Sequence, residues 1–297
     1  MPELPEVETV RRSLVDHVVG RRIVSARVGS FVGVLGPAGD AVLPALIGRT
    51  FTGLRRRGKY LIADLDDRTA LLIHLRMTGS LQVAVATDPP IRFEHLAIGL
   101  DDGAELRFAD QRKFGRVLHV DRDLLRALDR RLGPEPLSTA FTADRLGEMI
   151  LGRRGKVKSL LLDQHLIAGL GNIYVDEALF RARIHPERSG ADLSRDEVTR
   201  LHRAIRSSLR QGIAHNGTTF SSFQDGYGNR GDNVRNLRVY GKGRRGDACP
   251  RCGRPLTLAI VGGRSSHYCA NCQRPPAEDR PGIDEPAPAS TGRSGPE

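Results

Sequence analysis

CPRCGRPLTLAIVGGRSSHYCANC, residues 249–272, contains all four cysteines of the 297-residue chain. They form two C-x-x-C pairs separated by 16 residues, Cys249 with Cys252 and Cys269 with Cys272. A tight turn at each pair lets four thiolates converge on one tetrahedral Zn²⁺, and four protein ligands leave no position open for a substrate. We therefore predict one structural zinc. Two disulfides are the alternative, which a reducing compartment disfavours.

The segment between the two pairs, RPLTLAIVGGRSSHY, predicts a β-hairpin with Gly262 and Gly263 at its tip and Arg264 just beyond. Seven basic residues and one acidic residue lie between Lys242 and Arg274. A rigid hairpin that projects an arginine is suited to binding phosphate or entering a DNA groove. Solvated surface charge explains the same pattern equally well at this point.

The rest of the chain divides into a strand-rich half and a helical half. Residues 5–19 carry apolar side chains at helical spacing before Gly20. Short β-branched segments then predict a sandwich of antiparallel sheets; they are 22–28, 59–65, 70–77, 95–100, 104–110 and 115–120. From about residue 123 the periodicity becomes helical; the segments are 123–132, 142–151, 157–168, 172–182 and 194–215.

The predicted fold class is therefore α+β and multidomain. We expect an N-terminal helix and β-sandwich domain at 1–133, a helical domain at 134–240 and a four-cysteine zinc finger at 241–275. The last segment, 276–297, is rich in Pro, Gly, Ser and charge, which predicts a disordered tail.

The charge of the chain indicates the class of its partner. Lys and Arg number 46 against 35 Asp and Glu, a formal net charge of +11, and the commonest cellular polyanion is nucleic acid. No apolar run approaches the roughly 20 residues of a membrane span, and the N-terminus lacks the features of a signal peptide. We expect a cytoplasmic monomer with no membrane partner.

The N-terminus, MPELPEVETVRR (residues 1–12), brings an amine and acids together. Removal of Met1 would leave Pro2 with a free secondary amine beside the carboxylates of Glu3 and Glu6. An α-amine titrates near 7.7–8.0, so a nucleophilic neutral fraction exists at physiological pH. The structural alternative is that Pro5 opens a helix, with Glu6 at its positive end.

Residues 163–186, DQHLIAGLGNIYVDEALFRARIHP, predict a sharp turn at Gly169 and Gly171 followed by a helix with Asn172 as its N-cap. Amides exposed at such a helix start can bind phosphate, and Lys158 lies just upstream. An ordinary corner between two helices is the alternative.

Taken together, these motifs resemble the bacterial formamidopyrimidine-DNA glycosylases, which excise oxidised purines from DNA. The resemblance runs to about residue 275 through PELPEVETVRR, RRRGKYLIADL, HLRMTGSL, DQRKFGRV, GLGNIYVDEALF, GTTF, VYGKG and the zinc hairpin. It implies a helix-two-turn-helix motif in the helical domain, damaged double-stranded DNA as partner, and no cofactor besides zinc. It also implies glycosylase and abasic-site lyase activity, through a Schiff base on the N-terminal proline and β,δ-elimination.

The resemblance further implies roles for single residues. It implies four catalytic residues: Pro2 as nucleophile, Glu3 as proton donor and shuttle, Lys59 as a second active-site cation, and Arg264. Glu6 orients the N-terminus. The residues that fill the stack after base extrusion are Met77, Arg112 and Phe114. The remaining DNA contacts are His74, Lys158 and Asn172, with Arg264 also on phosphate. Core packing for Met77 and Phe114, and surface charge for Lys59 and Arg112, are the alternatives.

The segment 221–238, rich in Gly, Asn and Asp, is a candidate lid over the extruded base, but its composition does not identify the lesion. Oxidised purines such as 8-oxoguanine and formamidopyrimidines are the expected substrates. One alternative is a preference for oxidised pyrimidines, as in endonuclease-VIII-like enzymes, although those usually begin PEG rather than PEL. The other is a non-catalytic zinc protein that binds damaged DNA.

Overall fold

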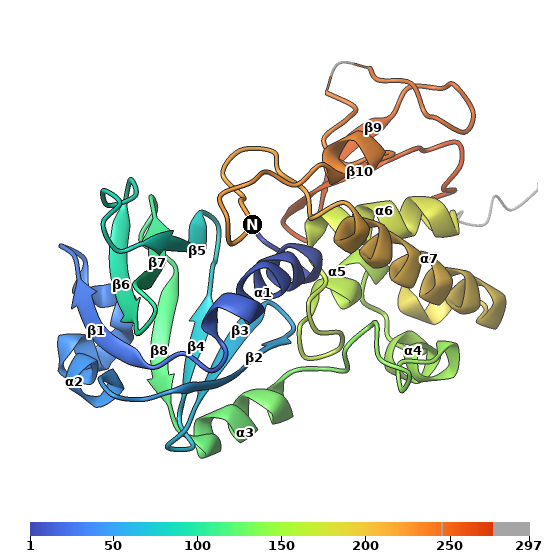
Figure 1. Ribbon diagram of the computed structural model, residues 1–297. Coiled ribbons are helices and arrows are strands. Elements are labelled where there is room, and N and C mark those ends of the chain that lie inside the picture. Colours follow the sequence, from blue (N-terminus) through green and yellow to red (C-terminus); the bar gives the residue numbers. More distant parts are fainter. Residues whose placement is uncertain (245, 276–297) are drawn as a thin grey trace, which may run out of the picture.

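Two lobes flank the first helix in the computed structural model, which describes residues 1–244 and 246–275 (Figure 1). A β-sandwich forms one lobe, and helices with a terminal β-hairpin form the other. The N-terminus lies between them (Figure 1). The tail predicted for 276–297 lies outside the described residues.

The first lobe contains two four-stranded antiparallel sheets, as the sequence predicts. One sheet has the order β1 (Ile23–Val28), β6 (Glu94–Leu100), β7 (Ala104–Asp110), β5 (Gly79–Val85). The other has the order β2 (Phe51–Arg57), β3 (Tyr60–Leu65), β4 (Ala70–His74), β8 (Arg116–Val120).

Strands β2 and β5 are absent from the segments named above because their local signals are weak. Strand β2 contains a glycine and three consecutive arginines, and β5 begins with glycine. They are strands because β2 pairs with β3, and β5 with β7, through backbone hydrogen bonds. Between β1 and β2, the chain forms a 3₁₀ segment η1 (Val32–Val42) and a short α2 (Leu43–Leu46), neither of which was predicted.

Helices build the second lobe. They are α4 (Ala143–Ile150), α5 (Val157–Leu162), α6 (Asn172–Ala182) and α7 (Arg195–Ala214), with 3₁₀ turns η2 (Gly190–Asp192) and η3 (Asn233–Asn236). Helix α3 (Arg122–Arg131) instead lies on the sandwich lobe, where Leu125 packs with Ile62, Ala70 and Val120 (Figure 1). The hairpin β9 (Thr257–Val261) and β10 (Arg264–Tyr268) completes the lobe. No helix within the described ranges is long and apolar enough to cross a membrane.

Two helix ends differ from the sequence prediction. Helix α5 ends at Leu162 rather than continuing to 168, because the Gln164 side chain bonds the carbonyls of Leu162 and Leu170 and the amide of Gly169, which stabilises a turn. The N-cap of α6 is Gly171 rather than Asn172.

Helix α1 (Leu4–Val18) contributes to both hydrophobic cores. Val7, Val10 and Leu14 pack in the sandwich core, whereas Leu4 packs among the helices and its amide donates to Gly169 O at 3.0 Å. The chain start is therefore held where the two lobes meet.

Candidate active site

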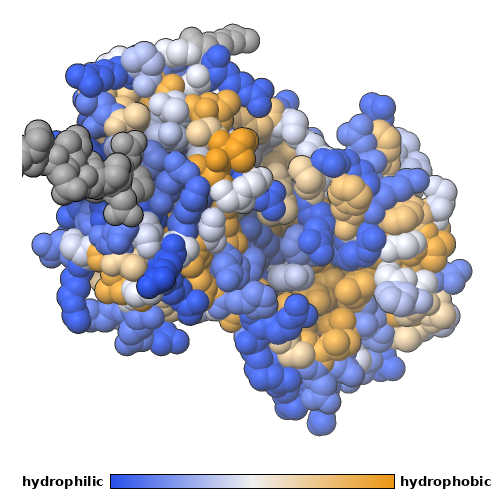
Figure 2. All heavy atoms as spheres, turned by 180° about the vertical axis from the view of Figure 1, so that it is seen from behind, coloured by the Kyte–Doolittle hydropathy of each residue, from blue (hydrophilic) through white to orange (hydrophobic). Residues whose placement is uncertain are grey.

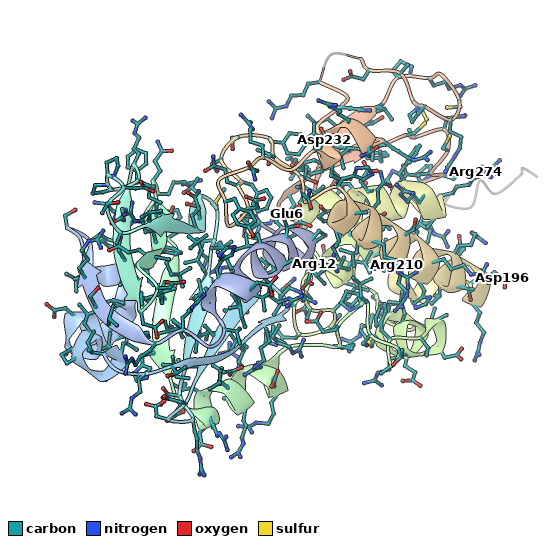
Figure 3. The ribbon with its side chains drawn as sticks, in the orientation of Figure 1. Glu6, Arg12, Asp196, Arg210, Asp232 and Arg274 are labelled. Carbon is teal, nitrogen blue, oxygen red and sulfur yellow. The ribbon has the colours of Figure 1, made fainter. Side chains whose placement is uncertain are left out.

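Glu6 ties the N-terminus to the helical lobe. It lies near the start of α1, between the lobes (Figure 3). Its Oε2 accepts from the Glu3 amide at 2.9 Å, and its Oε1 accepts from Tyr174 Oη at 2.6 Å and from the Thr218 amide at 2.8 Å. Burial raises the Glu6 pKa despite these donors. The arrangement fits the orienting role expected for Glu6.

The Glu3 carboxylate lies against the first turn of α6. It accepts from the Ile173 amide at 2.9 Å and the Tyr174 amide at 3.3 Å, which are unpaired within the helix. A Cβ atom at Gly171 would come within 2.4 Å of Glu3 Cδ. The second glycine of GLGN is thus required for the close approach of this carboxylate, a reason that the local sequence does not reveal.

Burial dominates the electrostatics of Glu3 and raises its pKa to about 7. The Lys59 charge lowers the Glu3 pKa, and Glu6 raises it further. Lys59, in the turn between β2 and β3, is only 7% exposed, and burial lowers its pKa. Glu3 and Glu6 raise the Lys59 pKa, whereas Arg264 lowers it. Three of the predicted catalytic side chains are therefore close enough to influence one another.

A pocket opens at Pro2, which is itself buried. Its walls come from the start of α1, the β4–β5 turn, α6 and the segment after α7; the lining residues are Met1, Pro2, Glu6, Met77, Ile173, Thr218, Phe220, Ser221, Ser222 and Phe223. Figure 2 shows the surface hollowed between the two lobes. Part of the candidate lid, 221–223, thus already borders the predicted nucleophile.

Met77, Arg112 and Phe114 meet at the surface of the sandwich lobe. Arg112 Nη1 lies 3.2 Å from Met77 Sδ, and its Cζ lies 5.0 Å from the Phe114 ring centroid. Met77 is 43% and Phe114 50% exposed, so the core alternative does not apply to either side chain. Exposed apolar side chains beside an arginine are suited to entering a base stack.

Asp110 fixes the two loops that carry this group, and the sequence analysis did not single it out. Its carboxylate accepts from the amides of Arg112 at 3.1 Å and Gly115 at 2.6 Å, and from Thr78 Oγ1. Thr78 follows Met77 in the β4–β5 turn. A single buried carboxylate therefore joins both loops.

His74 ends β4 and is 9% exposed. Burial, with the charges of Arg76 and Lys59, lowers its pKa to about 3, so the ring is neutral near pH 7. His74 Nδ1 accepts from the Arg76 amide at 3.0 Å, which leaves the ring proton on Nε2. The ring packs edge-on against Tyr60.

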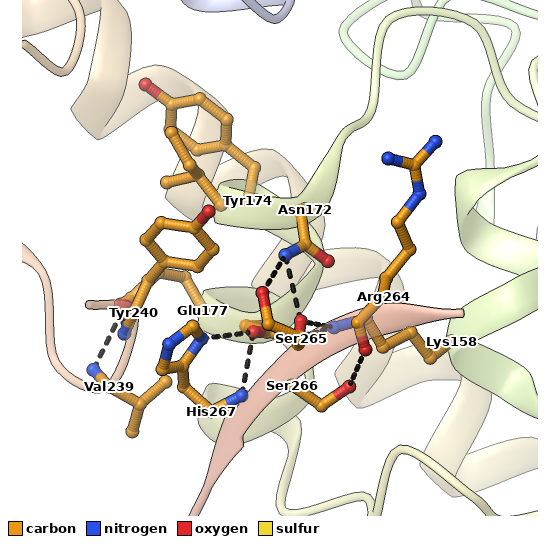
Figure 4. Close-up of polar contacts among 12 residues, drawn as sticks. Lys158, Asn172, Tyr174, Glu177, Val239, Tyr240, Arg264, Ser265, Ser266 and His267 are labelled. Atoms are coloured by element: carbon orange, nitrogen blue, oxygen red, sulfur yellow. Dashed lines mark hydrogen bonds and ion pairs between the residues drawn. The ribbon is translucent and has the colours of Figure 1, made fainter. Parts of the chain in front are cut away.

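Lys158, predicted to contact DNA, lies inside the protein. This side chain is fully buried, and its Nζ donates to Asp176 Oδ1 at 2.6 Å and to Ser265 O at 2.6 Å (Figure 4). Because the ammonium is paired inside the protein, it is not presented to a phosphate in this arrangement. Asn172 likewise donates from Nδ2 to Ser265 O at 2.8 Å.

Arg264 is exposed at the start of β10, and its guanidinium extends away from the hairpin (Figure 4). Among the described residues its side chain forms no hydrogen bond or ion pair. Its charge lowers the pKa of Lys59, so the Arg264 guanidinium lies within electrostatic range of that lysine.

The four cysteines have the geometry of a zinc site. Their Sγ atoms all lie within 4.8 Å of one another, with 3.9 Å between Cys249 and Cys272 and 3.6 Å between Cys252 and Cys269. A tetrahedral ion with Zn–S bonds of about 2.3 Å separates its sulfurs by about 3.8 Å. The four thiolates hold one structural Zn²⁺, and none of the four forms a disulfide.

Family models match the chain in the same order as these features. Residues 1–117 match the formamidopyrimidine-DNA glycosylase N-terminal domain, 132–224 match the formamidopyrimidine-DNA glycosylase H2TH domain, and 246–275 match a zinc finger found in FPG and IleRS. The fold and the site thus define a two-lobed protein of a DNA glycosylase type, with the expected helix-two-turn-helix region.

The chain belongs to the formamidopyrimidine-DNA glycosylase family. It is 47% identical over 275 residues to the formamidopyrimidine-DNA glycosylase of Roseiflexus sp., covering 92% of this chain and 100% of that protein. The corresponding protein of Herpetosiphon aurantiacus is 45% identical over 274 residues, with the same coverage.

Solved structures of the Lactococcus lactis protein are similar as well. Its complex with DNA containing an abasic site has a TM-score of 0.84 and 37% identity, covering 92% of this chain and 100% of that chain. A complex of the same protein with DNA containing an oxidised pyrimidine has the same TM-score and identity.

Proposed function

We propose that this chain excises oxidised purines, 8-oxoguanine and formamidopyrimidines, from double-stranded DNA and then cleaves the strand at the abasic site. One observation carries the proposal: Pro2 opens onto a pocket between the lobes, and the buried Glu3 beside it is half-protonated near neutral pH. The family names and the Lactococcus lactis complexes with damaged DNA support the substrate. A bacterial cytoplasmic location on the nucleoid would follow from that substrate.

The reaction begins at Pro2 once Met1 is removed. The neutral secondary amine attacks C1′ of the damaged nucleotide, the bond from C1′ to the base breaks, and the base leaves with the bonding electrons and takes up the proton that the amine loses. Glu3 donates a proton to the sugar ring oxygen as the ring opens. The product on Pro2 is a cationic iminium, because a secondary amine has no second proton to lose.

Strand cleavage follows from that cation. The iminium withdraws electrons and makes the proton on C2′ acidic, so a base can remove it while the 3′ phosphate leaves. A second elimination releases the 5′ phosphate. Glu3, after giving up its proton, is placed to accept the C2′ proton. Lys59 and Arg264 provide positive charge beside the phosphates of the damaged nucleotide.

Base extrusion precedes this chemistry. The target atom is inaccessible inside a duplex, so the nucleotide must leave the stack. We assign the filling of that gap to the exposed group of Met77, Arg112 and Phe114, with Arg112 facing the partner base. Asp110 holds the loops of this group in register.

Incision of defined duplexes tests the function. Labelled duplexes carry a single 8-oxoguanine, formamidopyrimidine or oxidised pyrimidine, and an undamaged duplex is the control. We expect incision of the two purine lesions at the highest rate. Oxidised pyrimidines cut faster than both would favour the endonuclease-VIII-like alternative, which the Lactococcus lactis complex with such a lesion makes worth measuring. Tight binding without incision of any lesion would indicate a non-catalytic damage-binding protein.

A further inference from the structure

Asp176, on α6, is a buried carboxylate that joins three donors and has no part in the proposed chemistry. It is 2% exposed. Its Oδ1 accepts from Lys158 Nζ at 2.6 Å, and its Oδ2 accepts from the amide of His267 at 2.8 Å and from His267 Nδ1 at 3.0 Å. It thereby connects α5 and α6 to strand β10.

The contacts of Lys158 continue to the residue beside Arg264. Lys158 Nζ donates to Ser265 O at 2.6 Å, and Asn172 Nδ2 donates to the same oxygen at 2.8 Å (Figure 4). Two donors of the helical lobe therefore hold one carbonyl of β10. Because Ser265 follows Arg264 directly, this carbonyl fixes the backbone from which the arginine projects.

The other end of the hairpin is held independently. Near the cysteines, Gln273 Nε2 donates to Ile184 O at 2.8 Å, and Phe180, Leu256 and the buried cysteines form a small hydrophobic cluster. The metal adds a further constraint there. Asp176 and its partners therefore hold the tip end, while the zinc end has its own contacts.

Electrostatics makes Asp176 and Lys158 depend on each other. Both side chains are at most 1% exposed, so neither charge is compensated by water. Removal of the carboxylate would leave a buried ammonium without its counter-charge, and the ammonium would have to move toward solvent or lose its proton. Movement toward solvent withdraws the donor from Ser265 O, and loss of the proton leaves a neutral amine that forms a weaker hydrogen bond to this carbonyl.

We propose that Asp176 is a positioning residue for Arg264: through Lys158 it holds β10 at Ser265 and so directs the Arg264 guanidinium to the phosphate of the damaged nucleotide. The inference rests on the proposed function for the identity of the anion. It assigns Lys158 a role in DNA binding that acts through the protein rather than by direct contact.

A double-mutant cycle on the zinc-loaded full chain tests the coupling. The measured quantity is affinity for a duplex that contains a tetrahydrofuran abasic analogue, at several salt concentrations. In the unmodified protein, Arg264→Ala should weaken binding and reduce the salt slope by about 0.9. In the Asp176→Asn background, the same Arg264→Ala change should have less than half of that fold-effect, because the guanidinium is already misdirected.

Two further variants make the cycle decisive. Glu197→Gln breaks the Arg188–Glu197 ion pair in the same lobe without touching the hairpin, and Arg264→Ala should keep its full effect there. If Asp176→Asn loses zinc or unfolds, the cycle is repeated with Asp176→Asn combined with Lys158→Met, which removes both buried charges.

An Arg264→Ala effect that is equal in the unmodified and Asp176 backgrounds would overturn the positioning role. Failure of the proposed function would be a different result. The cycle measures only affinity for the duplex, so it can be completed even with a chain that excises no base.

Discussion

The Glu3 carboxyl group experiences opposing influences. Two α6 amides and the Lys59 charge favour its ionised form, whereas burial favours the protonated form and has the largest effect, so its pKa is about 7. A group with that pKa can both give and take a proton near neutral pH.

Glu3→Gln should lower base excision about 10²- to 10⁴-fold and abolish the decline in rate above pH 7 that deprotonation of Glu3 causes.

The same variant should change how the free energy of unfolding depends on pH. The raised pKa means that the protonated carboxyl stabilises the fold below its ordinary value of 4.5, and that this stabilisation is lost as pH rises through about 7. The variant should therefore gain stability relative to the unmodified protein on going from pH 5 to pH 8. Urea unfolding at both pH values measures this, and parallel profiles would contradict the raised pKa.

Gly171→Ala should impair catalysis without unfolding the protein. The new Cβ would lie 2.4 Å from Glu3 Cδ, so the carboxylate must leave the α6 amides. We expect the rate of base excision to fall at least about tenfold. This loss is smaller than that of Glu3→Gln, because the proton donor is displaced rather than removed. Gly147→Ala, in α4, is the matched control, because its Cβ meets only ordinary contacts at 3.5 Å or more. Equal activity of the two variants would show that the close approach does not matter.

Single residues were the hardest part of the site to predict. The position of Lys158 just upstream of the glycine turn predicts a DNA contact, but its burial with Asp176 and Ser265 depends on β10, more than 80 residues away in sequence. Asp110 and Asp176 were missed because nothing in their local sequence distinguishes a buried carboxylate that organises loops from an exposed one. Pro2 and Glu3 can be proposed as a pair from the sequence because they are adjacent in it.

Elements with local signals were predictable. The zinc hairpin follows from cysteine spacing and a Gly-Gly turn, and helices α6 and α7 follow from apolar periodicity. Strand β2 was not predicted, because its Arg-rich end carries little strand signal and its pairing with β3 decides it. The orientation of α1 across two cores likewise depends on tertiary contacts.

Cys249→Ser should release the zinc, disorder the β9–β10 hairpin and weaken DNA binding, because the hairpin has little core of its own. Metal analysis and binding to an abasic-analogue duplex measure both effects. Ile260→Ser is the control on the same hairpin, since that side chain is 71% exposed and should keep the metal. Purified protein without zinc that still binds DNA normally would contradict the structural role of the metal.

At the scale of the whole molecule, the net charge of +11 should appear as salt-dependent binding. Affinity for damaged and undamaged duplexes should fall by roughly 0.9 log units per log unit of salt for each phosphate neutralised. Arg264→Ala should reduce this slope by about one contact and weaken both duplexes similarly. Arg112→Ala should instead alter the choice of base opposite the lesion with little change in slope. If Arg112→Ala reduced the salt slope and Arg264→Ala altered the choice of opposite base, the roles assigned to these two arginines would be wrong.

The position of the N-terminus between the lobes is the feature on which the proposed chemistry depends. Leu4 packs in one core and Val7 in the other, so the chain start is fixed between the lobes. Borohydride reduction traps an iminium as a stable covalent bond, which makes it the most direct measurement. With a duplex containing an abasic site, the unmodified protein should become covalently linked to DNA, and the peptide that carries the DNA should contain Pro2 at its N-terminus. A trapped peptide that does not contain the N-terminus would contradict the assignment of Pro2 as the nucleophile.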